Sequence, residues 1–399
     1  MKKKTKKMKI DKYFGRRLLA IVLLFLIIFF IYSIISKRKE KTPDLTILYN
    51  NELLSLEDNV IIENENKIYF SKEDVKKIFD NNIYYNEAEK ELITTYNKHV
   101  ALLKVDENYM MVNDSHIDLN AKLIEQNNKV YLPINDLAIV YDIEIEYSQK
   151  NNRIIIDSTL NEKIKAKTNK KANIKIKTNT FSKTIEKINK DDIIYILEKN
   201  EKYTKIRTQN GNIGFIKTKR IYDEEKIRDK WEEKLKEINI LTDYSEVLAT
   251  YENINIDKEK LNIVMPSFFF LDDNQKVLDK TNNTSGAFSG YINWANTNEI
   301  SVIPVFSNNA SVSKNLLTYS QRNNVINQLY QKVVTNGLKG ININFTSIDD
   351  VNSFYRFIIE LAPKFKESGL KVCVTMNKNI NKEKIENVVD YIIEEKKWN

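Results

Sequence analysis

The stretch from residue 339 to residue 346, KGININFT, alternates between apolar and polar side chains. Successive side chains of a strand point in opposite directions, so Ile341, Ile343 and Phe345 share one face. Two asparagines and a threonine share the other face. The pattern therefore predicts a strand that buries one face in a core and lines the other with amides and a hydroxyl.

Five further apolar runs lie in the same part of the chain, and helical stretches separate them. Between the third and fourth runs, apolar positions recur at helical spacing and end at Gly337. Strands that alternate with helices in this way are typical of parallel βαβ units. The six runs are 238–241, 261–271, 300–309, 339–346, 370–376 and 389–393.

A closed barrel of such units packs one face of each strand on helices and turns the other face inward. We therefore expect Asn342, Asn344 and Thr346 to point into the barrel, near the carboxyl ends of the strands. A complete barrel needs eight strands and about 250 residues, whereas 238–399 shows six runs. We expect an incomplete (β/α)8 TIM-type barrel. Three explanations stay open: a stable remnant, a module completed by a partner protein, or a truncated gene.

An internal repeat precedes this module. NKIYFSKEDVKKIF begins at Asn66 and NKVYLPINDLAIVY begins at Asn128. Each copy predicts a short strand, a two-turn helix and a hairpin, and Ser71 and Asp74 have the spacing of a helix start. Residues 45–158 are therefore expected to form an α+β repeat domain.

Residues 168–222 contain short alternating strands, with a strong hairpin signal at Asn210-Gly211. They predict a small β-barrel. The basic segment 163–175 is expected to be an exposed connector and the first site that trypsin cuts. Residues 223–237 are highly charged and contain no glycine or proline, which predicts a solvated connecting helix.

The net charge of +8 is concentrated at the N-terminus. Nine of the 63 basic residues and one of the 55 acidic residues lie in 1–17, which leaves 54 of each sign elsewhere. Binding of nucleic acid requires a basic surface on the folded part of the chain. The distribution of charge therefore excludes nucleic acid as a partner.

An uncharged segment of 18 residues, 18–35, follows this basic tail. As a helix it is about 27 Å long, close to the thickness of a bilayer core. No small-residue cleavage site follows it, which disfavours a signal peptide. We expect a transmembrane anchor over 18–36, with residues 1–17 in the cytoplasm and the later domains outside the cell membrane.

The side chains that commonly bind metals are few. Cys373 is the single cysteine and lies in an apolar run, so it is expected to be a buried, inert thiol. His99 and His116 have no companion at ligand spacing. The sequence predicts no disulfide, no metal site and no cofactor.

Two N-terminal modules resemble known families. The repeat, through VYLPINDLAIVYDIEIEY and RIIID, resembles the copper amine oxidase N-terminal-like domain found on surface proteins of Gram-positive bacteria, although copper ligands are absent. Residues 168–222 resemble a bacterial SH3-type barrel, with Phe215 where that family usually has tryptophan. Such barrels often bind peptidoglycan stem peptides. A spacer role stays open for both modules.

Four blocks of the C-terminal module, LNIVMPSFFFL, SVIPVFSNN, Arg322 and KGININFTSIDD, resemble family 18 glycoside hydrolases of the wall- and spore-associated bacterial branch, related to chitinases. The resemblance implies a TIM barrel that acts on chitin or peptidoglycan glycan, both of which contain N-acetylglucosamine. It places four side chains in the substrate site, namely Phe268, Asn308, Asn342 and Asn344.

The family's fourth strand carries Asp-Gly-x-Asp/Asn-x-Asp-x-Glu, in which the last Asp orients the substrate's acetamido group and the Glu protonates the glycosidic oxygen. In this chain the four acidic positions fall on Lys339, Asn342, Asn344 and Thr346. We therefore expect a membrane-anchored cell-envelope pseudoenzyme that binds peptidoglycan or another such glycan without cleaving it.

Two alternatives stay open. One is an active hydrolase of the chitinase or N-acetylglucosaminidase type that uses a relocated acid, for which Asp349, Asp350 and Glu360 are the nearest candidates. The other is a structural spacer that binds no ligand.

Overall fold

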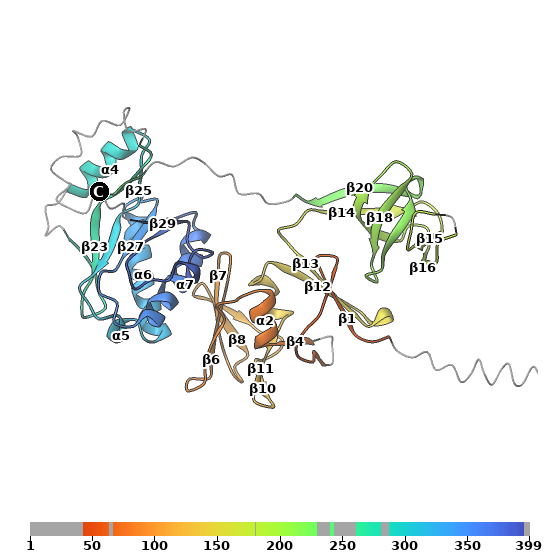
Figure 1. The fold of residues 1–399 in the computed structure, drawn as a ribbon, viewed down its shortest axis with the longest axis horizontal. Coiled ribbons are helices and arrows are strands. Elements are labelled where there is room, and N and C mark those ends of the chain that lie inside the picture. The colour runs from red at the N-terminus through yellow and green to blue at the C-terminus, as the bar shows by residue number, and fades with distance from the viewer. Residues whose placement is uncertain are drawn as a thin grey trace, which may run out of the picture.

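The computed structural model describes residues 43–63, 67–179, 181–229, 240–242, 261–280 and 287–394. They form three groups of elements, each with its own hydrophobic core (Figure 1). The predicted anchor and the basic tail lie outside the described residues. Among the residues that are described, no helix is long and apolar enough to cross a membrane.

The two repeat copies fold in related ways. In the first copy, β4 (Lys67–Ser71) leads into α2 (Lys72–Ile78) and the hairpin of β5 (Tyr84–Asn86) and β6 (Glu91–Tyr96). The Ser71 hydroxyl accepts a hydrogen bond from the Asp74 amide, which confirms the predicted helix start. The second copy comprises β11 (Lys129–Pro133), η2 (Asp136–Ile139), β12 (Ile143–Ser148) and β13 (Arg153–Ser158).

The predicted two-turn helix of the second copy is wrong, because η2 is a single short 3-10 turn. Asn135 stands at its cap position but makes no capping hydrogen bond. Its side-chain oxygen instead accepts from the amide of Ile68, at 2.8 Å, and so joins the two copies.

Three sheets complete this repeat module, in the orders β12-β13-β1-β2, β10-β11-β4-β3 and β5-β6-β7-β8-β9. The segments that precede the first copy and lie between the copies supply the remaining strands, which are β1 (Thr46–Tyr49), β2 (Glu52–Leu54), β3 (Ile61–Glu63), β7 (His99–Lys104), β8 (Tyr109–Val112), β9 (Ser115–Asp118) and β10 (Ile124–Gln126).

The second group is a seven-stranded antiparallel sheet in the order β16-β15-β19-β18-β17-β14-β20. The predicted turn at Asn210-Gly211 joins β18 to β19, and Gly211 has φ +77°, which favours glycine. The strands are β14 (Lys163–Thr168), β15 (Ala172–Lys175), β16 (Thr184–Ile188), β17 (Ile193–Lys199), β18 (Tyr203–Thr208), β19 (Ile213–Lys217) and β20 (Ile221–Arg228).

Two predictions fail at the ends of this sheet. The segment expected to be a connector forms β14 and β15, and β14 pairs with both β17 and β20. The first part of the expected connecting helix, 223–228, belongs to strand β20; residues 230–237 lie outside the described part. Ion pairs such as Lys167–Asp223 cross between β14 and β20, so pairing with a distant strand overrides the local helical preference.

The C-terminal group contains parallel strands in two sheets, β21-β22-β25 and β24-β23-β26-β27-β28-β29, with β24 antiparallel. Each of the six predicted runs overlaps at least one of these strands. The strands are β21 (Ile240–Thr242), β22 (Ile263–Met265), β23 (Ser267–Leu271), β24 (Val277–Asp279), β25 (Ser301–Val302), β26 (Val305–Asn308), β27 (Gly340–Asn344), β28 (Lys371–Thr375) and β29 (Tyr391–Ile393).

Helices pack on the outer face of these strands. Ile341, Ile343 and Phe345 are fully buried, and Phe345 contacts Phe354 and Phe357, as the alternation predicts. A smaller apolar cluster that includes Met265 and Cys373 lies on the opposite face. The helices are α4 (Ala287–Thr297), α5 (Val312–Asn315), α6 (Tyr319–Thr335) and α7 (Val351–Glu367).

The repeat module contacts both other groups. Helix α7 packs against β6 and β7, and its Lys364 forms an ion pair with Asp114. Arg207 of β18 makes a two-point ion pair with Asp157 of β13. Charged side chains therefore join segments that lie far apart in the sequence.

Candidate functional site

Asn342 lies on the inner face of β27 and is fully buried. Its amide nitrogen donates to the Thr375 hydroxyl at 3.0 Å and lies 3.4 Å from the Met265 sulfur. The same hydroxyl is 3.1 Å from the Asn342 side-chain oxygen. Asn342 thus points inward as predicted, but neighbouring strands already satisfy its amide.

Asn344 lies two residues after Asn342 on the same face of β27, nearer the carboxyl ends of the strands. It is paired in register with Ser307 of β26, and both residues are half-buried. Within the described part of the chain, no protein group forms a hydrogen bond with the Asn344 side chain. Asn344 therefore offers both a donor and an acceptor at the end of the sheet.

Thr346 and Lys339 lie beyond the two ends of β27. Thr346 follows the end of β27 and is exposed, while its backbone amide donates to the Asn308 side-chain oxygen at 3.1 Å. Lys339 is exposed and precedes β27, at the opposite end of the strand. Between them, Gly340 is needed for packing, because an added Cβ would lie 2.1 Å from the Lys371 carbonyl oxygen.

Asn308 is buried and bonded entirely to backbone groups. Its amide nitrogen donates to the carbonyl oxygens of Ser347, at 2.7 Å, and Ala310, at 3.1 Å. Because its oxygen holds the amide of Thr346, the side chain fastens the loop after β26 to the loop after β27. These bonds give Asn308 a positioning role, and its contact with substrate stays a prediction.

Phe268 is also placed differently from the expectation. It is 1% exposed and stacks on Phe288 beside helix α4, with ring centroids 4.0 Å apart. A register shift between β23 and β26 at this point breaks the alternation and leaves Phe268 and Phe269 in the same core. Phe268 is therefore a core residue rather than a sugar platform.

The two acids that follow β27, Asp349 and Asp350, form hydrogen bonds at the N-termini of helices α5 and α7. Asp349 accepts hydrogen bonds from the Ser311 and Ser313 hydroxyls and the Ser313 amide, and these bonds hold its pKa far below the usual range. Asp350 caps α7 by accepting from backbone amides. A general acid needs a pKa near the working pH, so Asp349 is unsuited to protonate a leaving group.

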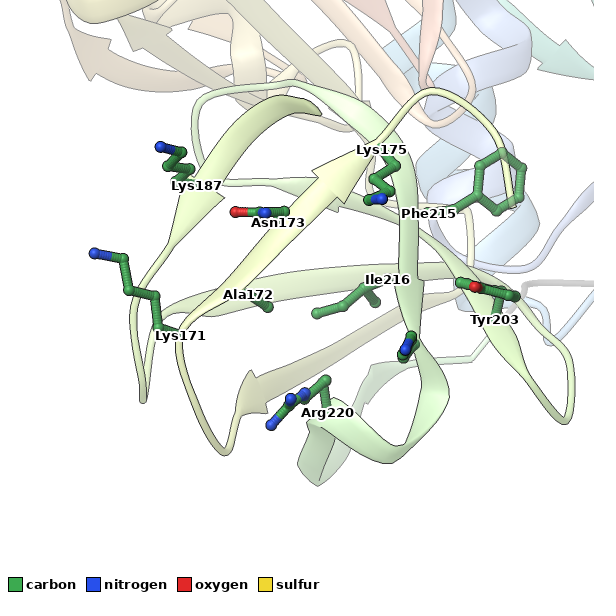
Figure 2. A pocket seen from close by; sticks show the side chains of 10 residues that line it. Lys171, Ala172, Asn173, Lys175, Lys187, Tyr203, Phe215, Ile216 and Arg220 are labelled. Atoms are coloured by element: carbon green, nitrogen blue, oxygen red, sulfur yellow. The ribbon is translucent and has the colours of Figure 1, made fainter. Parts of the chain in front are cut away.

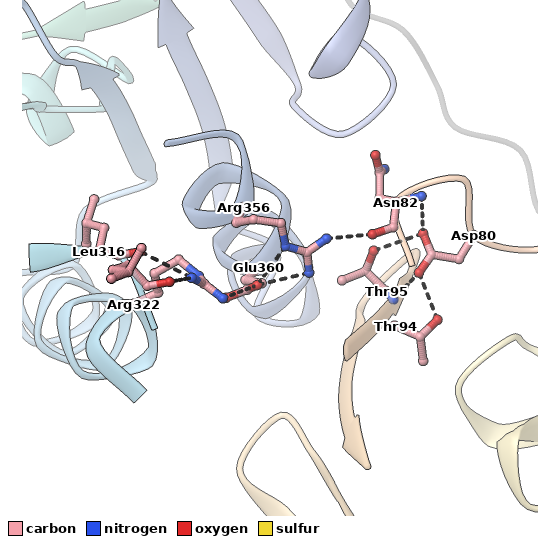
Figure 3. A network of polar contacts seen from close by, with 9 residues as sticks. Asp80, Asn82, Thr94, Thr95, Leu316, Arg322, Arg356 and Glu360 are labelled. Atoms are coloured by element: carbon pink, nitrogen blue, oxygen red, sulfur yellow. Dashed lines mark hydrogen bonds and ion pairs between the residues drawn. The ribbon is translucent and has the colours of Figure 1, made fainter. Parts of the chain in front are cut away.

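Glu360, the third candidate acid, is buried on α7. Arg322 of α6 and Arg356 of α7 both bind its carboxylate (Figure 3). These two ion pairs take up the carboxylate between α6 and α7. Its role is structural.

A hollow of about 410 Å3 lies on the seven-stranded sheet, away from these residues (Figure 2). Its walls combine basic side chains with the apolar side chains of Ala172, Phe215 and Ile216. The sequence reasoning did not predict it, because its lysines come from several strands that only the sheet brings together. The lining residues are Lys171, Ala172, Asn173, Lys175, Lys187, Tyr203, Phe215, Ile216, Lys217 and Arg220.

Residues 48–156 match the family model of the copper amine oxidase N-terminal domain, which confirms the first resemblance. In the portion of the chain that the structure describes, no three His, Cys, Asp or Glu side chains are placed to hold a metal ion. A search of curated proteins returns no match to this chain.

Solved structures similar to this chain include several chitinases. A class V chitinase from Pseudomonas fluorescens Pf-5 is 17% identical, with 40% of this chain and 53% of that chain covered and a TM-score of 0.36. A chitinase from Bacteroides thetaiotaomicron is 14% identical, with 40% of this chain and 53% of that chain covered and a TM-score of 0.34. The chain therefore spans about half the length of these structures.

Proposed function

We propose that this is a cell-envelope protein that binds an N-acetylglucosamine-containing glycan, such as peptidoglycan, without cleaving it. Residues 18–36 anchor it in the cell membrane with the N-terminus in the cytoplasm. The observation that carries the proposal is the half-buried amide of Asn344, which has no protein partner in the described part of the chain and lies at the carboxyl ends of the parallel strands.

The chemistry of Asn344 suits an acetamido group. A side-chain amide presents one carbonyl acceptor and two N–H donors, and the acetamido group presents a complementary acceptor and donor. Asn344 can therefore exchange two hydrogen bonds with one N-acetylglucosamine residue. The Ser307 hydroxyl, on the next strand, donates to the Phe269 carbonyl oxygen at 3.4 Å and can accept a hydrogen bond from the same sugar.

The same side chains are unsuited to hydrolysis. Asn344 is neutral and does not balance the positive charge that develops on an oxazolinium-like intermediate, a form of stabilisation that is often the largest catalytic contribution. The Thr346 hydroxyl is far too weak an acid to protonate a glycosidic oxygen. Binding without turnover follows from this combination.

The other two groups are proposed to hold the protein at the cell wall. The repeat module packs on helix α7 and so holds the glycan-binding module in place. The seven-stranded module is proposed to be an SH3-like barrel that makes a further contact with the envelope.

Co-sedimentation of the full chain, in detergent, with purified peptidoglycan tests the proposal. Asn344→Leu should weaken binding by about tenfold or more, because two hydrogen bonds worth roughly 1 kcal/mol each are lost. Asn296→Leu, on the exposed side of α4, is the matched control and should bind normally. Equal binding by both variants would contradict the role of Asn344.

A further inference from the structure

The hollow on the seven-stranded module gathers positive charge from distant parts of the sheet. It opens over β15, β16, β18, β19 and the turn η4 (Thr218–Arg220), and Figure 2 shows basic side chains around its rim. None of its ten lining residues is acidic. Five are cationic, namely Lys171, Lys175, Lys187, Lys217 and Arg220.

The hollow differs in its charge pairing from the β14 and β20 side of the same sheet. On the β14 and β20 side, Lys167 pairs with Asp223, Lys199 with Glu224 and Lys226 with Glu162. Among the described residues, by contrast, four of the five cations of the hollow form no ion pair: Lys171, Lys187, Lys217 and Arg220. Clustered unpaired cations create a positive potential that attracts an anion.

The absence of acidic side chains from the lining narrows the class of ligand. A zwitterionic peptide would bring ammonium groups that find no carboxylate in the hollow, whereas a wholly anionic chain meets no such penalty. Lysine ammonium groups bind phosphate readily as point charges. Tyr203 and Phe215 are half-buried and present ring surface to the C–H groups of a polyol or sugar.

We propose that this hollow binds a phosphodiester polymer in which phosphate groups alternate with polyol units such as glycerol. The site is separate from the glycan site around Asn344, so either can fail without the other. Together the two sites would let one envelope protein hold a neutral glycan and an anionic polymer.

Binding of poly(glycerol phosphate) to the full chain in detergent, measured by calorimetry, tests the proposal. Lys171→Gln, Lys187→Gln and Lys217→Gln combined should weaken binding by at least about tenfold. Raising the salt concentration should also weaken binding to the unmodified chain, because these charges are exposed and are screened over about 10 Å at 0.1 M salt. The matched control combines Lys167→Gln, Lys199→Gln and Lys226→Gln, which change the net charge equally on the other side, and should bind normally.

Equal weakening by both triple variants would overturn the proposal, because it would indicate general charge attraction. Poly-γ-glutamate binding as tightly as poly(glycerol phosphate) would overturn the preference for phosphate. Equally tight binding of glycerophosphoglycerol, a soluble lipid headgroup, would overturn the assignment to a polymer. Asn344→Leu should leave poly(glycerol phosphate) binding unchanged, which distinguishes this site from the glycan site.

Discussion

The carboxylate of Glu360 is enclosed by Arg322, whose Nε lies 2.7 Å from one carboxylate oxygen. Arg356 lies one turn before Glu360 on helix α7, and its guanidinium approaches the other carboxylate oxygen at 2.9 Å. The same guanidinium also donates to the carbonyl oxygen of Asn82 in the repeat module (Figure 3). Glu360 therefore joins α6 to α7 and holds the arginine that reaches the neighbouring module.

Glu360→Gln should destabilise the C-terminal module by about 3–5 kcal/mol, because Arg322 is 3% exposed and would lose its counter-charge. Hydrogen exchange of α6 and α7 measures the effect directly. Glu383→Gln changes an exposed acid and serves as the control. Unchanged exchange in the Glu360 variant would show that this ion pair contributes little.

Asp157 predicts an acid-sensitive junction between the repeat module and the seven-stranded module. Burial alone would raise its pKa, but hydrogen bonds and charges from Arg207 and Lys163 outweigh burial and lower it. Because the folded pKa lies below the unfolded value of about 3.9, the contribution to stability is present above that pH and is lost as the pH falls through the folded pKa.

Hydrogen exchange at β13 and β18 should therefore rise as the pH falls below about 4, after correction for the intrinsic rate. Asp157→Asn should raise exchange already at pH 7 and reduce this dependence on pH. If hydrogen exchange depended on pH identically in the variant and the unmodified chain, Asp157 would not be the source of the acid sensitivity.

Asn342→Asp should destabilise the module by several kcal/mol at neutral pH. The new carboxylate would lie fully buried beside Met265 and Cys373, and an unpaired buried charge is costly. Acidification should restore part of the stability, because protonation removes the charge. Unfolding by urea at pH 7 and pH 4.5 measures both effects. Asn344→Asp places the new carboxylate at a half-buried position and should reduce the free energy of unfolding by less.

The sequence predicted the parts of the fold that depend on local patterns. Ile341, Ile343 and Phe345 alternate with polar residues, so the inner and outer faces of β27 followed from side-chain period alone. Ser71 and Gly211 have local roles, in a helix cap and a turn, and both were predictable for the same reason.

The features that were missed depend on distant partners. Strand β20 is charged and has no local strand signal, and it forms because β14, far away in the sequence, supplies hydrogen bonds and opposite charges. The burial of Phe268 depends on a register shift that its own neighbours do not encode. Of the two arginines that enclose Glu360, Arg356 stands four residues earlier on the same helix and is a local partner. Arg322 lies on another helix, and nothing near Glu360 in the sequence indicates it.

The proposed anchor makes a prediction about topology. Protease added to intact cells stripped of their wall should degrade the three described groups of elements and leave the tail before Leu18 protected. Antibodies against the two ends of the chain report the outcome. Protection of the region around Trp294 would contradict an extracytoplasmic location.

The central claim is that the strand ends around Asn344 bind the sugar but lack the acid that cleaves it. Chitohexaose incubated with the full chain and followed by mass spectrometry tests this most directly. We predict an intact oligosaccharide, retained by the unmodified chain and released by Asn344→Leu. The double variant Asn344→Asp with Thr346→Glu should still show activity near background, because repair of two side chains does not rebuild the site around them. Cleavage by the unmodified chain that Asp349→Asn abolishes would contradict the account.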